Sequence, residues 1–133
     1  MRPSYDGLLP VELLGSGPGL TPAGDDVLAG FLVAAHATAD PRLAGWQDAV
    51  RDRLLRVRTT AVSLAMLQCA LDGYATTELS DYLYAVCDDG PAGSRKRLHR
   101  ATAALQAVGH SSGAALMAGV QLALSTRLVR GAA

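Results

Sequence analysis

The sequence predicts an all-α domain, and its composition carries that prediction. Half of the 133 residues are hydrophobic, whereas aromatic residues make up only 5%. Alanine, leucine and glycine dominate, and such small side chains let helices pack closely, while strands would call for more β-branched and aromatic residues. A chain of this length forms one domain. We therefore expect a compact five-helix domain over residues 1–133, with residues 1–14 as an irregular lead-in.

A glycine-rich turn precedes the first expected helix. Residues 15–26 contain four glycines, two prolines, a threonine and two adjacent acids. Thr21 is a good N-cap, and Pro22 suits the first helical position. The helix is then expected over residues 22–38, and because it is apolar almost all round, it should lie buried in the core.

The other helices follow from the spacing of apolar residues and from the glycines and prolines between them. Apolar side chains recur every three or four positions, which is the period of one helix face. The four further helices expected are a long one over residues 45–72, a short one capped by Thr77, one from Ser94 to Gly109, and a last one from Ser111 or Ser112.

Charge and hydropathy exclude two classes of partner. Lys and Arg together number 12, as do Asp and Glu, so the formal net charge is zero and a nucleic-acid partner is not expected. The longest apolar run, residues 27–39, is too short to cross a membrane. Cys69 and Cys87 fall within apolar segments, where buried free thiols are typical of a reducing compartment. These observations favour a cytoplasmic protein.

Asp25 and Asp26 are the first candidates for chemistry, because they stand at the start of a buried helix. Acids in the first turn can simply offset the helix dipole. Alternatively, a carboxylate facing a pocket binds a divalent cation through water, accepts a hydrogen bond from a ligand amide, or acts as a base. Adjacent helical residues point about 100° apart, so we expect one acid to cap nearby backbone and the other to face the pocket.

A second polar group interrupts the apolar part of the long expected helix. It comprises Arg58, Thr59, Thr60 and Ser63. The hydroxyl groups either bond to carbonyls of their own helix or line a polar pocket. Arg58 is the best candidate for binding an anion through two parallel hydrogen bonds, although a salt bridge is its commoner role.

A third polar group opens the last helix, at residues 109–113. Ser111 or Ser112 can serve as the N-cap, with His110 as a turn residue. Alternatively, a neutral His110 accepts a proton or binds a ligand. Two exposed helix N-termini edged with small polar residues also form a plausible site for a small anion.

These three groups resemble the motifs of the AllH-type family, which is associated with oxamate carbamoyltransferase. Residues 17–26 are similar to its long first motif, and the three blocks occur in the family's order. The second and third blocks comprise Thr59, Thr60, Ser63, Leu67, Ala70 and Gly73, and then residues 109–113 with Leu116 and Gly119.

The resemblance implies a subunit associated with an enzyme that exchanges carbamoyl groups between oxalurate and phosphate in purine-nitrogen catabolism. It also implies a shortened member, because the family's proteins carry an additional N-terminal region. The expected partners are a small-molecule ligand and either a second copy of the chain or a partner transferase subunit.

We therefore expect a small anionic or amide ligand, such as oxamate, carbamoyl phosphate or phosphate, between the helix N-termini. One alternative is a non-catalytic helical scaffold or interaction subunit; another is an enzyme that uses Mg²⁺ to act on a phosphorylated metabolite. The expected catalytic residues are Asp25, Asp26 and His110. The expected ligand-binding residues are Gly17, Gly19, Thr21, Gly24, Arg58, Thr59, Thr60, Ser63, Ser111, Ser112 and Gly113.

Overall fold

Helices account for all the regular secondary structure in the part of the chain that the computed structural model describes, which is residues 9, 11–17, 19–88, 93–109 and 111–131. The all-α prediction is confirmed, with six α-helices in place of five. Most of the lead-in lies outside the described residues, and its end forms a short 3-10 helix. The elements are η1 (Val11–Leu13), α1 (Ala23–Ala37), α2 (Leu43–Leu54), α3 (Ala61–Leu71), α4 (Thr77–Cys87), α5 (Gly93–Gln106) and α6 (Ser112–Gly131).

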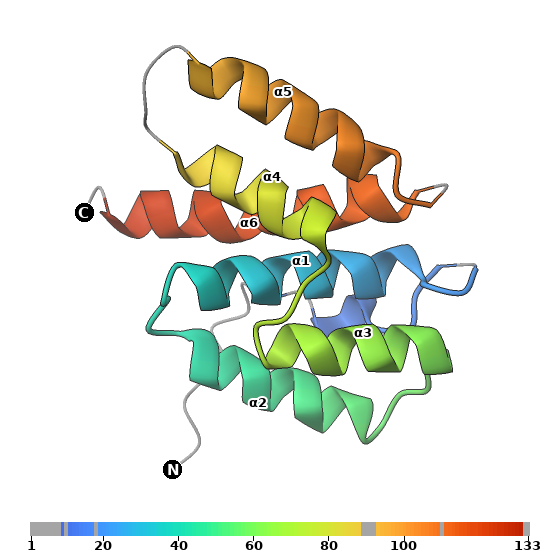
Figure 1. Ribbon diagram of the computed structural model, residues 1–133. Coiled ribbons are helices and arrows are strands. Elements are labelled where there is room, and N and C mark those ends of the chain that lie inside the picture. Colours follow the sequence, from blue (N-terminus) through green and yellow to red (C-terminus); the bar gives the residue numbers. More distant parts are fainter. Residues whose placement is uncertain (1–8, 10, 18, 89–92, 110, 132–133) are drawn as a thin grey trace.

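The first α-helix lies at the centre of the fold, as predicted. In Figure 1, α1 runs between α2 and α3 on one side and α4 and α6 on the other, while α5 covers the outer side of α4. Nearly all of α1 is buried, and the ring of Phe31 meets that of Trp46 in α2 edge-on, with centroids 4.7 Å apart. Burial of these apolar side chains is the main force holding the layers together.

Helices α1 and α6 pack so closely that their backbones touch. A Cβ atom at Gly30 would lie 2.1 Å from the carbonyl oxygen of Leu116, and one at Gly119 would lie 2.0 Å from that of Val27. Only glycine allows this approach without a shift of the chain. The two helices run in the same direction, so both N-termini lie at the same end of the molecule (Figure 1).

The prediction of one long helix over residues 45–72 is wrong, because the chain leaves the helical path between Leu54 and Ala61. Thr60 is the N-cap of α3, and its hydroxyl oxygen accepts a hydrogen bond from the Ser63 backbone N–H at 3.1 Å. The same hydroxyl donates to the carbonyl oxygen of Leu20. These bonds compete with helix formation and start a new helix instead.

Two predicted caps also differ from the structure. The N-cap position of α1 is Pro22 rather than Thr21, and no side chain caps that helix. The N-cap of α4 is Thr76, one residue earlier than predicted, since its hydroxyl oxygen accepts the backbone bond in place of Thr77. Threonine is a good cap at either position of such a pair, so composition alone does not select between them.

The outward face of α3 is apolar and exposed. Val62 and Leu64 are 52% and 37% exposed, and residues 59–71 include no charged side chain. Cys69 on the same helix and Cys87 at the end of α4 are exposed free cysteines, which corrects the expectation that both thiols are buried. An apolar segment predicts a buried helix only where other parts of the fold cover each of its faces.

No helix within the described ranges has the length and hydropathy to span a membrane.

Candidate functional site

The three polar groups singled out in the sequence meet at one end of the fold, where α1, α3 and α6 begin (Figure 1). The hydroxyl oxygens of Thr21 and Ser112 are 2.8 Å apart and joined by a hydrogen bond. On the other side of α1, the hydroxyl of Thr59 donates to a carboxylate oxygen of Asp25. Each of the flanking helices is therefore linked to the start of α1 by polar side chains.

Asp25 is a buried carboxylate with both oxygens engaged. The backbone N–H of Gly15 donates to Oδ1 at 2.6 Å, and the Thr59 hydroxyl donates to Oδ2. The residue is 0% exposed. Hydrogen bonds to a charged acceptor are among the stronger ones in proteins. Asp25 thus connects the glycine-rich turn to the segment before α3, which is a structural task.

Asp26 is equally buried, but its carboxylate has no hydrogen-bond partner. It is 1% exposed, and neither oxygen is bonded. Burial raises the pKa of this carboxyl from 3.8 to about 6; the nearby Ser112 and Thr21 hydroxyls lower the pKa in part, and the charge of Asp25 raises it further. Leaving a buried carboxylate without donors is costly, so this group is poised to take a proton or a donor from elsewhere.

The hydroxyl pair beside Asp26 has one hydrogen to spare. Either Thr21 or Ser112 donates to the other, and each hydroxyl carries one hydrogen and two lone pairs. Both hydroxyls lie close enough to the Asp26 carboxylate to lower its pKa as hydrogen-bond donors, although neither oxygen of Asp26 makes a hydrogen bond of full geometry. One hydrogen of the pair is therefore not used in the bond between the two hydroxyls.

Ser63 is a second buried polar group without a partner. The residue is 0% exposed, and its Oγ makes no hydrogen bond. Its backbone N–H donates to Thr60, so only the side chain is unsatisfied. Ser63 belongs to α3, on the side of α1 where Asp25 is already engaged.

Two of the glycines predicted to bind ligand lie where segments of the chain come close together. A Cβ atom at Gly24 would lie 2.0 Å from the carbonyl oxygen of Leu13 in η1, and one at Gly113 would lie 1.7 Å from that of Leu105 in α5. The space beside each glycine is therefore occupied by protein backbone. Gly17 and Gly19 belong to the turn before α1 and have positive φ angles of 111° and 95°.

The remaining candidates are not part of this buried cluster. Arg58 and Ser111 are exposed, and His110 lies outside the described residues. Within the described part of the chain, no three or more His, Cys, Asp or Glu side chains are grouped so that they could hold a metal ion. Sequence reasoning missed the Gly15 backbone N–H, since a backbone donor gives no side-chain signal.

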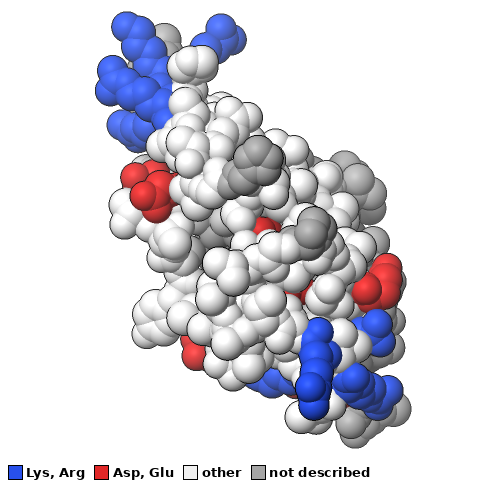
Figure 2. All heavy atoms as spheres, turned by 90° about the vertical axis from the view of Figure 1, so that its right-hand side faces the viewer, with Lys and Arg blue, Asp and Glu red and all other residues white. Residues whose placement is uncertain are grey.

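Figure 2 shows the end of the molecule at which α1, α3 and α6 begin. Basic side chains gather at its upper and lower extremities, whereas the broad middle is almost entirely uncharged. Small carboxylate surfaces show there, recessed among uncharged atoms. Few charged side chains surround this area, so a polar group there feels only weak fields from other charges.

The match to known families covers all three polar groups. No solved structure matches the chain. The family model of the oxamate carbamoyltransferase subunit AllH matches residues 13–124, which begin in η1 and end within α6. This match confirms the resemblance carried by the three motifs. The chain therefore belongs to the family of the oxamate carbamoyltransferase subunit AllH.

Proposed function

We propose that this subunit holds a small ligand at Asp26, beside the N-termini of α1 and α6. The observation that carries the proposal is a carboxylate that is 1% exposed and makes no hydrogen bond of full geometry, with only the Thr21 and Ser112 hydroxyls near enough to lower its pKa. Buried polar side chains are nearly always hydrogen-bonded, so an unsatisfied one calls for an explanation. A ligand that donates hydrogen bonds to Asp26 supplies the missing partners.

The surroundings of Asp26 favour a ligand with both an amide and an anionic group. An amide N–H donates to the carboxylate, while the spare hydroxyl hydrogen of the Thr21–Ser112 pair binds a ligand oxygen. Negative charge on that part of the ligand is stabilised by the two helix N-termini. Oxamate carries an amide and a carboxylate on adjacent carbons, and carbamoyl phosphate carries an amide and a phosphate, so both fit this requirement.

Asp26 also has the acid–base character for a proton transfer. Its pKa of about 6 is close to neutral pH, which is where a general base works best. In this proposal Asp26 binds the ligand amide and takes its proton as the amide nitrogen forms a bond to the carbamoyl carbon and phosphate leaves, and Asp25 keeps the turn in place. A proton-transfer role for His110 is proposed from its place in the third motif.

We further propose that the outward face of α3 binds a partner subunit of the transferase. The family model describes a subunit of an enzyme, which implies partner chains. The exposed apolar face of α3 includes Val62 and Leu64. It adjoins the Thr60 cap, at the same end of the molecule as the proposed site. Apolar, uncharged surfaces of this kind form the centre of stable interfaces. A partner docked there would cover α3 and lie beside the end at which the ligand binds.

The structure gives one argument for the scaffold alternative. The glycines at 24, 30, 113 and 119 all allow backbones to approach closely, and Asp25 acts within the protein. In that alternative the polar side chains at this end serve packing alone, and Asp26 binds nothing.

Calorimetry with oxamate and oxalate distinguishes the two functions. Oxalate has nearly the size of oxamate but carries a second negative charge in place of the amide and has no N–H group, so a site built on the Asp26 carboxylate should bind oxamate at least tenfold more tightly. Asp26→Asn should lose most of this preference, because an amide both donates and accepts. Asp48→Asn is the matched control, since it removes one exposed acid from α2.

The titration should be run on the chain alone and with its partner subunits, with carbamoyl phosphate, phosphate and Mg²⁺ as additional probes. Preference for oxamate that survives in Asp26→Asn would contradict the proposed role of Asp26. Absence of binding under every condition would favour the scaffold. Binding that depends on Mg²⁺ would favour a metal-dependent enzyme.

A further inference from the structure

A second cleft, lined by α4 and α5, is separate from the Asp26 site. It has a volume of about 520 Å³, and its lining consists of Asp81 and Tyr84 from α4 and Lys96, Arg97, Arg100, Ala101 and Ala104 from α5. This volume is within the usual range for small-molecule sites, roughly 300–1,000 Å³. Three cations face one acid, so the cleft carries net positive charge although the whole chain is neutral.

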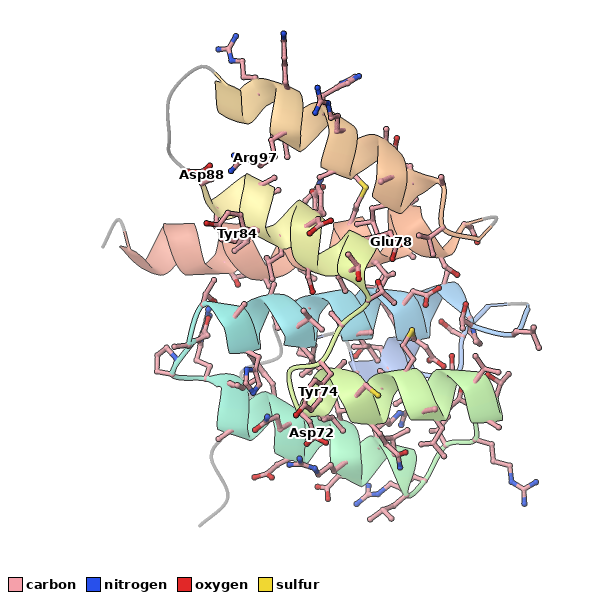
Figure 3. All side chains as sticks on the ribbon, viewed as in Figure 1. Asp72, Tyr74, Glu78, Tyr84, Asp88 and Arg97 are labelled. Atoms are coloured by element: carbon pink, nitrogen blue, oxygen red, sulfur yellow. The ribbon has the colours of Figure 1, made fainter. Side chains whose placement is uncertain are left out.

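Two of the three cations have no ion-pair partner among the described residues. Arg97 donates to Asp88 at 3.1 Å (Figure 3). Within the described ranges, neither Lys96 nor Arg100 has an acidic group at ion-pair distance. These two side chains are four positions apart on α5 and share one helix face, where like charges repel. No acid of the described residues neutralises this pair of charges, which attracts anions.

The position of these cations in α5 is itself unfavourable. Arg95, Lys96 and Arg97 lie near the N-terminus of the helix, and its first turn contains no acid. Positive charge near a helix N-terminus opposes the helix dipole. A bound anion would remove both the repulsion between the cations and their conflict with the dipole.

Tyr84 adds an aromatic surface to the cleft. Its side chain comes from α4 and is 70% exposed (Figure 3), which is unusual for a large aromatic residue with no covering segment. An exposed ring beside basic groups stacks against a planar ligand. Asp81, on the same wall, accepts hydrogen bonds from hydroxyl or N–H groups.

We propose that this cleft binds a phosphate ester carrying a planar ring, which is the chemistry of a nucleotide. Lys96 and Arg100 bind the phosphate, Tyr84 stacks on the ring, and Asp81 accepts from the polar part between them. The volume of about 520 Å³ suits a small molecule. The site would give the subunit a ligand independent of the one at Asp26.

Calorimetry of the full chain with ADP, inorganic phosphate and adenosine tests the proposal. We expect ADP to bind most tightly, phosphate more weakly, and adenosine least. The double variant Lys96→Ala, Arg100→Ala should lower the affinity for ADP at least tenfold. Tyr84→Ala should lower the affinity for ADP and leave that for phosphate unchanged. Binding should weaken as the salt concentration rises.

A matched control removes the same charge elsewhere. Arg51→Ala combined with Arg95→Ala takes two exposed cations from outside the cleft and should leave ADP binding intact. An equal loss in this control would mean non-specific attraction and would overturn the proposal. So would absence of ADP binding, or a dependence on Lys96 and Arg100 seen only with an acidic partner protein. Asp26→Asn should bind ADP normally, so failure at one site is distinguishable from failure at the other.

Discussion

The hydroxyl groups of Thr21 and Ser112 bond to each other at 2.8 Å, although 91 positions separate them in the sequence. Thr21 lies just before α1, and Ser112 is the first residue of α6. The bond therefore joins the starts of two parallel helices beside the buried carboxylate of Asp26, whose pKa both hydroxyls lower. This arrangement makes the three side chains a coupled group.

The coupling between Thr21 and Ser112 can be measured with a double-mutant cycle. Thr21→Val and Ser112→Ala should each reduce the free energy of unfolding, but the double variant should lose less than the sum. We expect an interaction energy of about 0.5–1.5 kcal/mol, the usual net value of such a bond. Urea denaturation of the four proteins gives the values. Strict additivity would show that the bond contributes nothing in solution.

Asp26 should make the protein less stable as the pH rises. Its folded pKa of about 6 exceeds the ordinary value of 3.8, so between these values the folded state binds more protons than the unfolded state. Its contribution to the free energy of unfolding therefore falls from about pH 4 to pH 6 and then levels off. Asp26→Asn should remove this dependence and be more stable than the wild type at about pH 8, by roughly 1–3 kcal/mol.

The neighbouring acid provides the control for that experiment. Asp25→Asn is the same chemical change one residue away, but both Asp25 oxygens accept hydrogen bonds. It should lower the free energy of unfolding by about 1–3 kcal/mol. Denaturation of both variants across this pH range checks the prediction, and effects of the same sign would contradict the different roles assigned to the two acids.

Gly30→Ala should destabilise the fold. The added Cβ would lie 2.1 Å from the Leu116 carbonyl oxygen, so α1 and α6 would have to move apart. Overpacking of this kind costs about 1–3 kcal/mol, which outweighs the roughly 1 kcal/mol that alanine contributes to an ordinary helix. Ala118→Leu adds more volume to an exposed position of α6 and should change the melting temperature little. A more stable Gly30→Ala protein would disprove the close approach.

The two cysteines should report on the partner interface. Both thiols are exposed and should react with a thiol reagent in the folded protein. A partner subunit bound to the outward face of α3 should protect Cys69, which belongs to that helix, and leave Cys87 at the end of α4 reactive. Mass spectrometry of the labelled protein measures each site. Equal protection of both thiols, or of neither, would contradict the proposed interface.

Periodicity and composition predicted the helical fold and the central position of the first helix, because one helix with apolar residues on every face needs cover on every side. They failed between α2 and α3. The hydroxyl of Thr60 binds Leu20, a residue 40 positions away, and such a contact exists only once the fold has formed. Local propensity therefore favoured a continuous helix where tertiary hydrogen bonds favour a break.

The sequence allowed the three groups of site residues to be predicted, but it did not show which of the two acids, Asp25 or Asp26, has a structural role. A rotation of about 100° between adjacent helical positions indicated that Asp25 and Asp26 face different ways. Which of them is satisfied depends on the Gly15 backbone N–H and on Thr59. Neither contact could be located before the path of the glycine-rich turn was known.

The contact between α1 and α6 at Gly30 and Gly119 also limits how this family can change its ligand. Where side chains separate two helices, a smaller or larger residue resets the gap between them. Here main chain rests on main chain, so the two N-termini are already as near as van der Waals contact allows, and any added side chain at the contact widens the gap at a cost in stability. In the proposed site, a change of ligand without loss of stability would therefore fall to the side chains at positions 21, 26 and 112.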